Sequence, residues 1–169
     1  MQDRTNSVTQ AVQTTRGREG KYLTFTLAGE EYGIGILKIR EIICIMPVTS
    51  VPQSPDFVKG VINLRGKVIP VIDLRLRFGM LPMDYTERTC IIVVQIDLQD
   101  TPLNIGIVVD SVSEVLNISG GNIENTPTFG TQMNTEYIQG MAKIEGGVKI
   151  LLDIDKVLTE NEISFCLDS

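Results

Sequence analysis

The chain has 169 residues, a formal net charge of −6 and a sequence pI near 4.7. It contains no His, which excludes Ser-His-Asp and Cys-His catalysis and the usual imidazole acid–base step. The acidic balance argues against a nucleic-acid partner, and the short apolar runs argue against a membrane span. The three Cys, at 44, 90 and 166, are too few for a four-thiolate zinc site, so we expect reduced and mostly buried thiols in a cytosolic protein that needs no metal or cofactor.

Regular structure is expected to begin at Lys21, after a polar stretch over residues 1–20 that is typical of a flexible tail. Leu23, Phe25 and Leu27 alternate with Thr residues, which predicts a half-buried strand. The stretch 34–43 suits either a helix or strands. Its β-branched residues favour strands with a kink near Leu37, and both Ile42 and Ile43 are expected in the core.

An internal repeat is the most informative feature, because residues 57–74 align without a gap on residues 137–154. In each copy the pattern predicts a helical turn, two short strands and a final helical stretch. The first turn would run from Ser54 as N-cap to Gly60, and Asn134 or Thr135 would cap its counterpart ending at Gly140. Gly66 and Gly146 would each take the first loop position of a type II′ hairpin.

Two Asp residues recur at matched positions of the repeat, Asp73 and Asp153, each before a helical stretch. An acid–base pair is conceivable, but two helix N-caps are the favoured reading. The glycines at 60, 66, 140 and 146 lack the spacing of a phosphate loop and are interpreted as structural. Asp97, Asp100 and Asp110 lack the alternation of a calcium loop.

Arg65 is the candidate functional residue of the repeat, because Glu145 stands at its matched position. A fold that tolerates both charges does not need either one there. The alternatives of a contact residue and of a solvated loop side chain remain equally open at this point.

The segments Glu31-Tyr32-Gly33-Ile34, Asn63-Leu64-Arg65-Gly66 within its apolar frame, 106–116 and Ile150-Leu151-Leu152-Asp153 resemble the CheW family of bacterial chemotaxis coupling proteins. The resemblance runs from about Lys21 to Leu158. It implies a mostly β fold of two SH3-like five-stranded β-barrel subdomains with short helices. We expect these subdomains over residues 21–82 and 83–169, with strands that may cross between them.

The resemblance also implies a non-enzymatic adaptor that joins the cytoplasmic tips of methyl-accepting chemoreceptors to the regulatory domain of the CheA histidine kinase. Such a protein is cytoplasmic and is recruited to membrane receptor arrays without inserting into the membrane. By motif position, the residues expected to contact receptor or kinase are Ile39, Glu41, Arg65 and Val115. A related protein serving another pathway, such as twitching motility, is the alternative.

Overall fold

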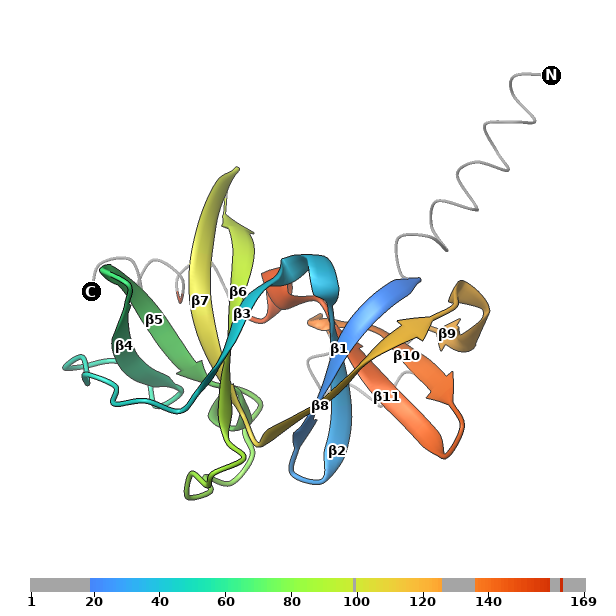
Figure 1. Ribbon diagram of the computed structural model, residues 1–169, viewed down its shortest axis with the longest axis horizontal. Helices are drawn as coiled ribbons and strands as arrows, with labels where there is room; N and C mark the ends of the chain where they lie inside the picture. The colour runs from blue at the N-terminus through green and yellow to red at the C-terminus, as the bar shows by residue number, and fades with distance from the viewer. Residues whose placement is uncertain (1–18, 99, 126–135, 159–161, 163–169) are drawn as a thin grey trace.

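The computed structural model describes residues 19–98, 100–125, 136–158 and 162, which form two β-sheets (Figure 1). Sheet A has the order β8-β1-β2-β11-β10-β9 and sheet B the order β3-β6-β7-β5-β4. Sheet A comprises β1 (Gly20–Leu27), β2 (Glu30–Gly35), β8 (Ser111–Ile118), β9 (Ile123–Glu124), β10 (Ile138–Ile144) and β11 (Gly147–Leu152). Sheet B comprises β3 (Ile39–Cys44), β4 (Val58–Leu64), β5 (Lys67–Asp73), β6 (Cys90–Leu98) and β7 (Thr101–Val109).

Four short helical segments link the strands: η1 (Ile36–Lys38), α2 (Leu74–Arg77), η2 (Gly120–Asn122) and η3 (Ile154–Lys156). The predicted kink near Leu37 is confirmed, because η1 separates β2 from β3. The mostly β composition is likewise confirmed.

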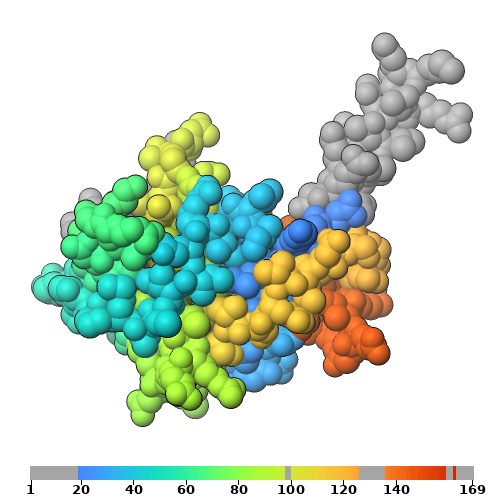
Figure 2. All heavy atoms as spheres, viewed as in Figure 1, coloured from blue at the N-terminus to red at the C-terminus, as the bar shows by residue number. Residues whose placement is uncertain are grey.

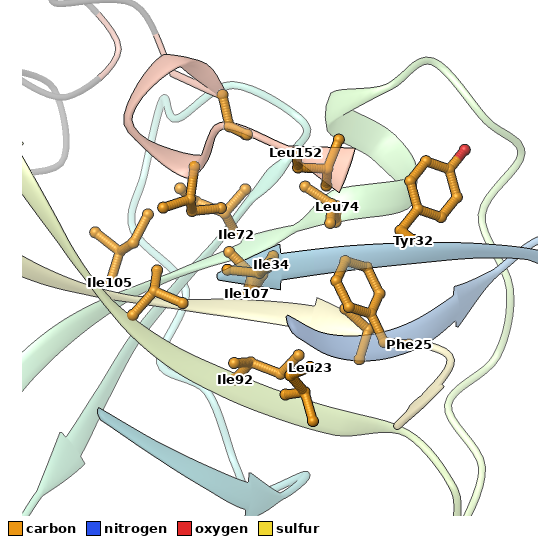
Figure 3. Close-up of a cluster of buried hydrophobic side chains, with 14 of the residues drawn as sticks. Leu23, Phe25, Tyr32, Ile34, Ile72, Leu74, Ile92, Ile105, Ile107 and Leu152 are labelled. Atoms are coloured by element: carbon orange, nitrogen blue, oxygen red, sulfur yellow. The ribbon is translucent and has the colours of Figure 1, made fainter. Parts of the chain in front are cut away.

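The buried side chains form three clusters, one between the sheets and one within each sheet. The largest takes Phe25 and Ile34 from sheet A and Ile92 and Ile107 from sheet B, so it lies between the sheets (Figure 3). A second cluster, around Ile62 and Val71, belongs to sheet B, and a third, around Tyr22 and Leu151, belongs to sheet A. The fold therefore has a core within each sheet and a shared core between them.

Each sheet contains strands from both halves of the sequence. In sheet A, the parallel pair β11–β2 joins the N-terminal hairpin β1–β2 to strands of the second half. In sheet B, the parallel pair β5–β7 joins the hairpin β6–β7 to strands of the first half. Strands from before and after residue 82 thus share each sheet, and the two copies of the repeat, β4–β5 and β10–β11, lie in different sheets.

The predicted helical turn over residues 54–60 is wrong, because β4 already begins at Val58. The Ser54 hydroxyl donates a hydrogen bond to the Val51 carbonyl at 2.8 Å instead of capping a helix. Gly60 ends no helix but lies at a register shift within β4, and Gly140 occupies the matching shift in β10. The proposed caps Asn134 and Thr135 lie outside the described residues.

The predicted loop position of Gly66 is also wrong. Leu64 pairs with Lys67, so Arg65 and Gly66 form the two-residue loop, and both have positive φ, 52° and 86°. These are the signs of a type I′ turn, which matches the twist of a hairpin. In the second copy Ile144 pairs with Gly147, and Gly146 has a φ of 94° at the second loop position.

Two cysteines depart from the expected burial. Cys44 is exposed and Cys90 is partly buried, while Cys166 lies outside the described residues.

The predicted flexible tail over residues 1–20 lies outside the described residues except for Glu19 and Gly20, and Gly20 is the first residue of β1.

Candidate functional site

Arg65 and Glu41, two of the four candidate contact residues, form an ion pair in the structure. The Arg65 guanidinium donates from Nη1 to Glu41 Oε1 at 3.0 Å and from Nη2 to Oε2, the paired geometry of a strong charge-assisted contact. This bonding holds the pKa of the Glu41 carboxyl below its ordinary value. Since β3 and β4 lie at opposite ends of sheet B, the pair connects the outer strand β3 to the loop that follows the other outer strand, β4.

The tip of the β4–β5 hairpin presents Arg65 to solvent. The side chain of Asn63 accepts a hydrogen bond from the Gly66 N–H at 2.9 Å, which supports the turn. The side chain of Arg65 is 72% exposed and that of Glu41 is 29% exposed, so this pair can be rearranged by an incoming partner.

Strand β3 alternates between two environments. Ile39, Glu41 and Ile43 are partly buried, whereas Arg40, Ile42 and Cys44 are exposed. The prediction of a buried Ile42 is wrong, since 43% of this residue is exposed. Period-two alternation places neighbouring residues on opposite faces, so the sequence held the signal that Ile42 and Ile43 cannot share one core.

Ile39 packs against the shared core, at the point where η1 leads into β3. The preceding residue, Lys38, forms ion pairs with Asp155 at 2.7 Å and with Asp97 at 3.6 Å. Burial lowers the pKa of Lys38, but the two carboxylates outweigh it and the net direction is upward. Leu37, which sequence reasoning did not select, is 88% exposed beside this anchored segment.

Val115 lies in the other sheet, on β8, where it pairs with Leu23. Between the pairs Leu23–Val115 and Phe25–Val112 the register shifts, because β8 has one residue more than β1. There the Thr24 side chain exchanges hydrogen bonds with the backbone of Glu114. Val115 is left 51% exposed. Strands β3 and β8 both lie on the side of the molecule that faces the reader in Figure 1, and atoms of both reach the surface in Figure 2.

The four glycines predicted to be structural differ in their surroundings. A Cβ at Gly60 would lie 1.9 Å from the Thr49 carbonyl oxygen, and its φ is 139°, so only glycine fits there. Gly66 and Gly146 face open space but have positive φ. Gly140 is buried at the register shift of β10.

Asp73 accepts hydrogen bonds from the N–H groups of Arg75 and Leu76 at the start of α2. Its other oxygen accepts from the Tyr85 hydroxyl at 3.0 Å. Asp153 accepts from the Asp155 N–H at 3.2 Å before η3. Both carboxylates thus accept hydrogen bonds at helix N-termini, as expected of N-cap residues.

In the residues that the structure describes, no helix is long and apolar enough to cross a membrane. Two of the three acidic residues considered for a cation pair with basic side chains instead. Asp110 pairs with Arg75 through Nε at 2.8 Å, and Asp97 pairs with Lys38.

The sequence and the fold both match known chemotaxis proteins. The family model described as "CheW-like domain" matches residues 21–162. The chain is 40% identical over 158 residues to the chemotaxis protein CheW of Klebsiella aerogenes, covering 94% of this chain and 92% of that protein. It is 32% identical to CheW of Bacillus subtilis, covering 82% of this chain and 86% of the relative.

Among solved structures, the scaffolding protein TtCheW from Thermoanaerobacter tengcongensis superposes with a TM-score of 0.74 at 34% identity. The match covers 85% of this chain and 95% of that one. The chain therefore belongs to the CheW-like family of chemotaxis scaffold proteins.

Proposed function

We propose that this adaptor joins the cytoplasmic tips of chemoreceptors to the regulatory domain of the CheA kinase. The observation that carries the proposal is the match of a CheW-like family model to residues 21–162, together with the 40% identity to a CheW protein. An adaptor of this kind acts by binding rather than by catalysis. The cytoplasmic side of a receptor array is its expected place.

We assign the receptor and kinase contacts to the surface of Ile39, Glu41, Arg65 and Val115. The exposed pair Arg65–Glu41 supports this, because an ion pair open to solvent contributes little to folding and is free to exchange partners. The half-exposed Val115 supplies an apolar contact, and helical receptor tips dock through apolar anchors with charged neighbours.

We further propose that each sheet is one SH3-like five-stranded barrel, with β8 and β9 of sheet A counted as one strand interrupted by η2. Residues 21–82 and 83–169 are then the two subdomains, and they exchange strands: β1 and β2 lie in sheet A, and β6 and β7 lie in sheet B. In sheet B, Thr49 bridges Val61 on β4, and the pair Arg65–Glu41 links the outer strand β3 to the loop that follows β4. In sheet A, Glu124 of β9 pairs with Met141 of β10. Met141 is the residue that the repeat aligns with Val61, so Glu124 corresponds to Thr49. The same closing contact in both copies is the support for two barrels.

The test is copurification of the chain with a receptor signalling fragment and with the CheA regulatory domain, each separately and then together. We expect binding in both single mixtures and a three-component complex. Binding to neither would contradict the adaptor function. Binding of both by an R65E variant with wild-type affinity would remove Arg65 from the contact surface while leaving the adaptor intact.

A further inference from the structure

Cys44 and Cys90 are directly opposite each other in the antiparallel pair β3–β6. Cys44 is the last residue of β3 and Cys90 the first of β6, and both thiols are free. Opposite residues of antiparallel strands lie about 4.5 or 5.5 Å apart at Cα, and their side chains share a face. Both spacings fall within the roughly 4.4–6.8 Å that a disulfide allows.

We propose that Cys44 and Cys90 form a dithiol modification site that a peroxide converts into a disulfide. The Cβ atoms of opposite residues start about 4.5–5.5 Å apart, and a disulfide needs about 3.5–4.5 Å, so the strands must approach slightly. Strand β3 is an outer strand of sheet B, and both residues stand at strand ends, where the backbone has the most freedom to move.

The two thiols have different surroundings, which sets the order of events. Cys44 is exposed and meets the peroxide first. Cys90 is partly buried, and its thiol donates to the Arg88 carbonyl at 3.3 Å. Burial, together with the neighbouring Cys44, raises the pKa of the Cys90 thiol, which slows its own reaction with peroxide, so Cys44 reacts first.

In the first step the Cys44 thiolate attacks one peroxide oxygen. An S–O bond forms, the O–O bond breaks, and the departing hydroxide takes a proton to become water, leaving Cys44 as a sulfenic acid. In the second step Cys90 loses its proton and attacks the Cys44 sulfur, so that the S–S bond forms and the S–O bond breaks. The departing hydroxide takes up the proton and leaves as a second water. Two thiols are oxidised and one peroxide is reduced, and an external dithiol reverses the change.

The experiment uses the full chain with C166S, which leaves these two thiols alone, and hydrogen peroxide as the oxidant. We expect a monomeric product lighter by two hydrogens, a Cys44–Cys90 cross-link in peptide maps, and full recovery with dithiothreitol. The matched variants C44S/C166S and C90S/C166S retain one thiol each and should instead gain oxygen. Independent oxidation of Cys44 beyond the sulfenic acid, with Cys90 still a free thiol, would overturn the proposal.

A second probe needs no serine substitution at Cys44 or Cys90. Phenylarsine oxide binds two neighbouring thiols through one arsenic, so the C166S protein should take up one arsenic and lose both titratable thiols. Retention of both thiols at saturating arsenical would also overturn the proposal.

Discussion

At the scale of single residues, changes to the pair Arg65–Glu41 should affect receptor binding much more than folding. We predict that the R65E variant still folds and that its melting temperature falls only slightly, by the loss of one ion pair, because the Arg65 side chain is 72% exposed and Glu145 occupies the matched position of the repeat. The same variant should bind a receptor fragment several-fold more weakly, and the salt dependence of binding should fall. Thermal melts and binding at low and high salt check both statements.

The charge-swapped double variant E41R/R65E is the matched control, since it restores an ion pair with the charges exchanged. If receptors recognise the charges, the double variant stays weak. Full recovery of receptor affinity would mean that the pair acts only within this protein.

The pair should also respond to pH. Because the pKa of Glu41 is lowered in the folded protein, its stabilising effect is complete above the ordinary carboxyl range and is lost as pH falls through that lowered pKa. We expect the titration of the Glu41 carboxyl, followed by NMR, to move up to its ordinary range in an R65Q variant. An unchanged Glu41 titration would contradict the pairing.

At the scale of elements, the glycines of the hairpins differ in what a side chain would meet. We predict that G60A lowers the free energy of unfolding the most, by about 2–4 kcal/mol, since its Cβ would collide with the Thr49 carbonyl in addition to the backbone strain. G66A and G146A, which face open space at positive φ, should each lose about 1–2 kcal/mol. Denaturant unfolding of the three variants measures this order, and equal losses would refute it.

The strands show what could be predicted from the sequence. The alternation of Leu23, Phe25 and Leu27 predicted β1, and the repeat predicted the hairpins. The helical turn over 54–60 was mispredicted because Ser, Pro and Gly suit a helix cap as well as a loop. The close contact of Gly60 with the Thr49 backbone favours the strand, and it joins residues eleven positions apart in the sequence.

The candidate site was less predictable for a similar reason. Arg65 was selected from its turn and its repeat position, but its partner Glu41 lies 24 residues away and its pairing depends on how sheet B curves. The cross-strand pair Cys44–Cys90 likewise needs the register of β3 on β6, which no local pattern contains.

At the scale of the whole molecule, Asp110 connects the hairpin β1–β2 of sheet A to α2. Its Oδ2 accepts from the Ala28 N–H at 2.9 Å and from Arg75 Nη2 at 2.9 Å, while Oδ1 accepts from Arg75 Nε at 2.8 Å. We predict that D110N lowers the free energy of unfolding by about 1–3 kcal/mol. The amide nitrogen that replaces one carboxylate oxygen cannot accept a hydrogen bond, and the charge of Arg75, whose side chain is only 15% exposed, loses its partner. The variant D100N, at an exposed residue before the other end of β7, is the control, with little change expected in denaturant unfolding, and equal behaviour of the two would contradict the role given to Asp110.

Coupling between receptor and kinase is the central property of this adaptor, and reconstitution tests it most directly. A receptor signalling fragment, the CheA kinase and this chain would be mixed, and kinase autophosphorylation measured with and without the chain. We predict receptor-dependent kinase activity only when the chain is present, and its loss with R65E. Receptor control of the kinase that is the same in the absence of the chain would contradict the function assigned here.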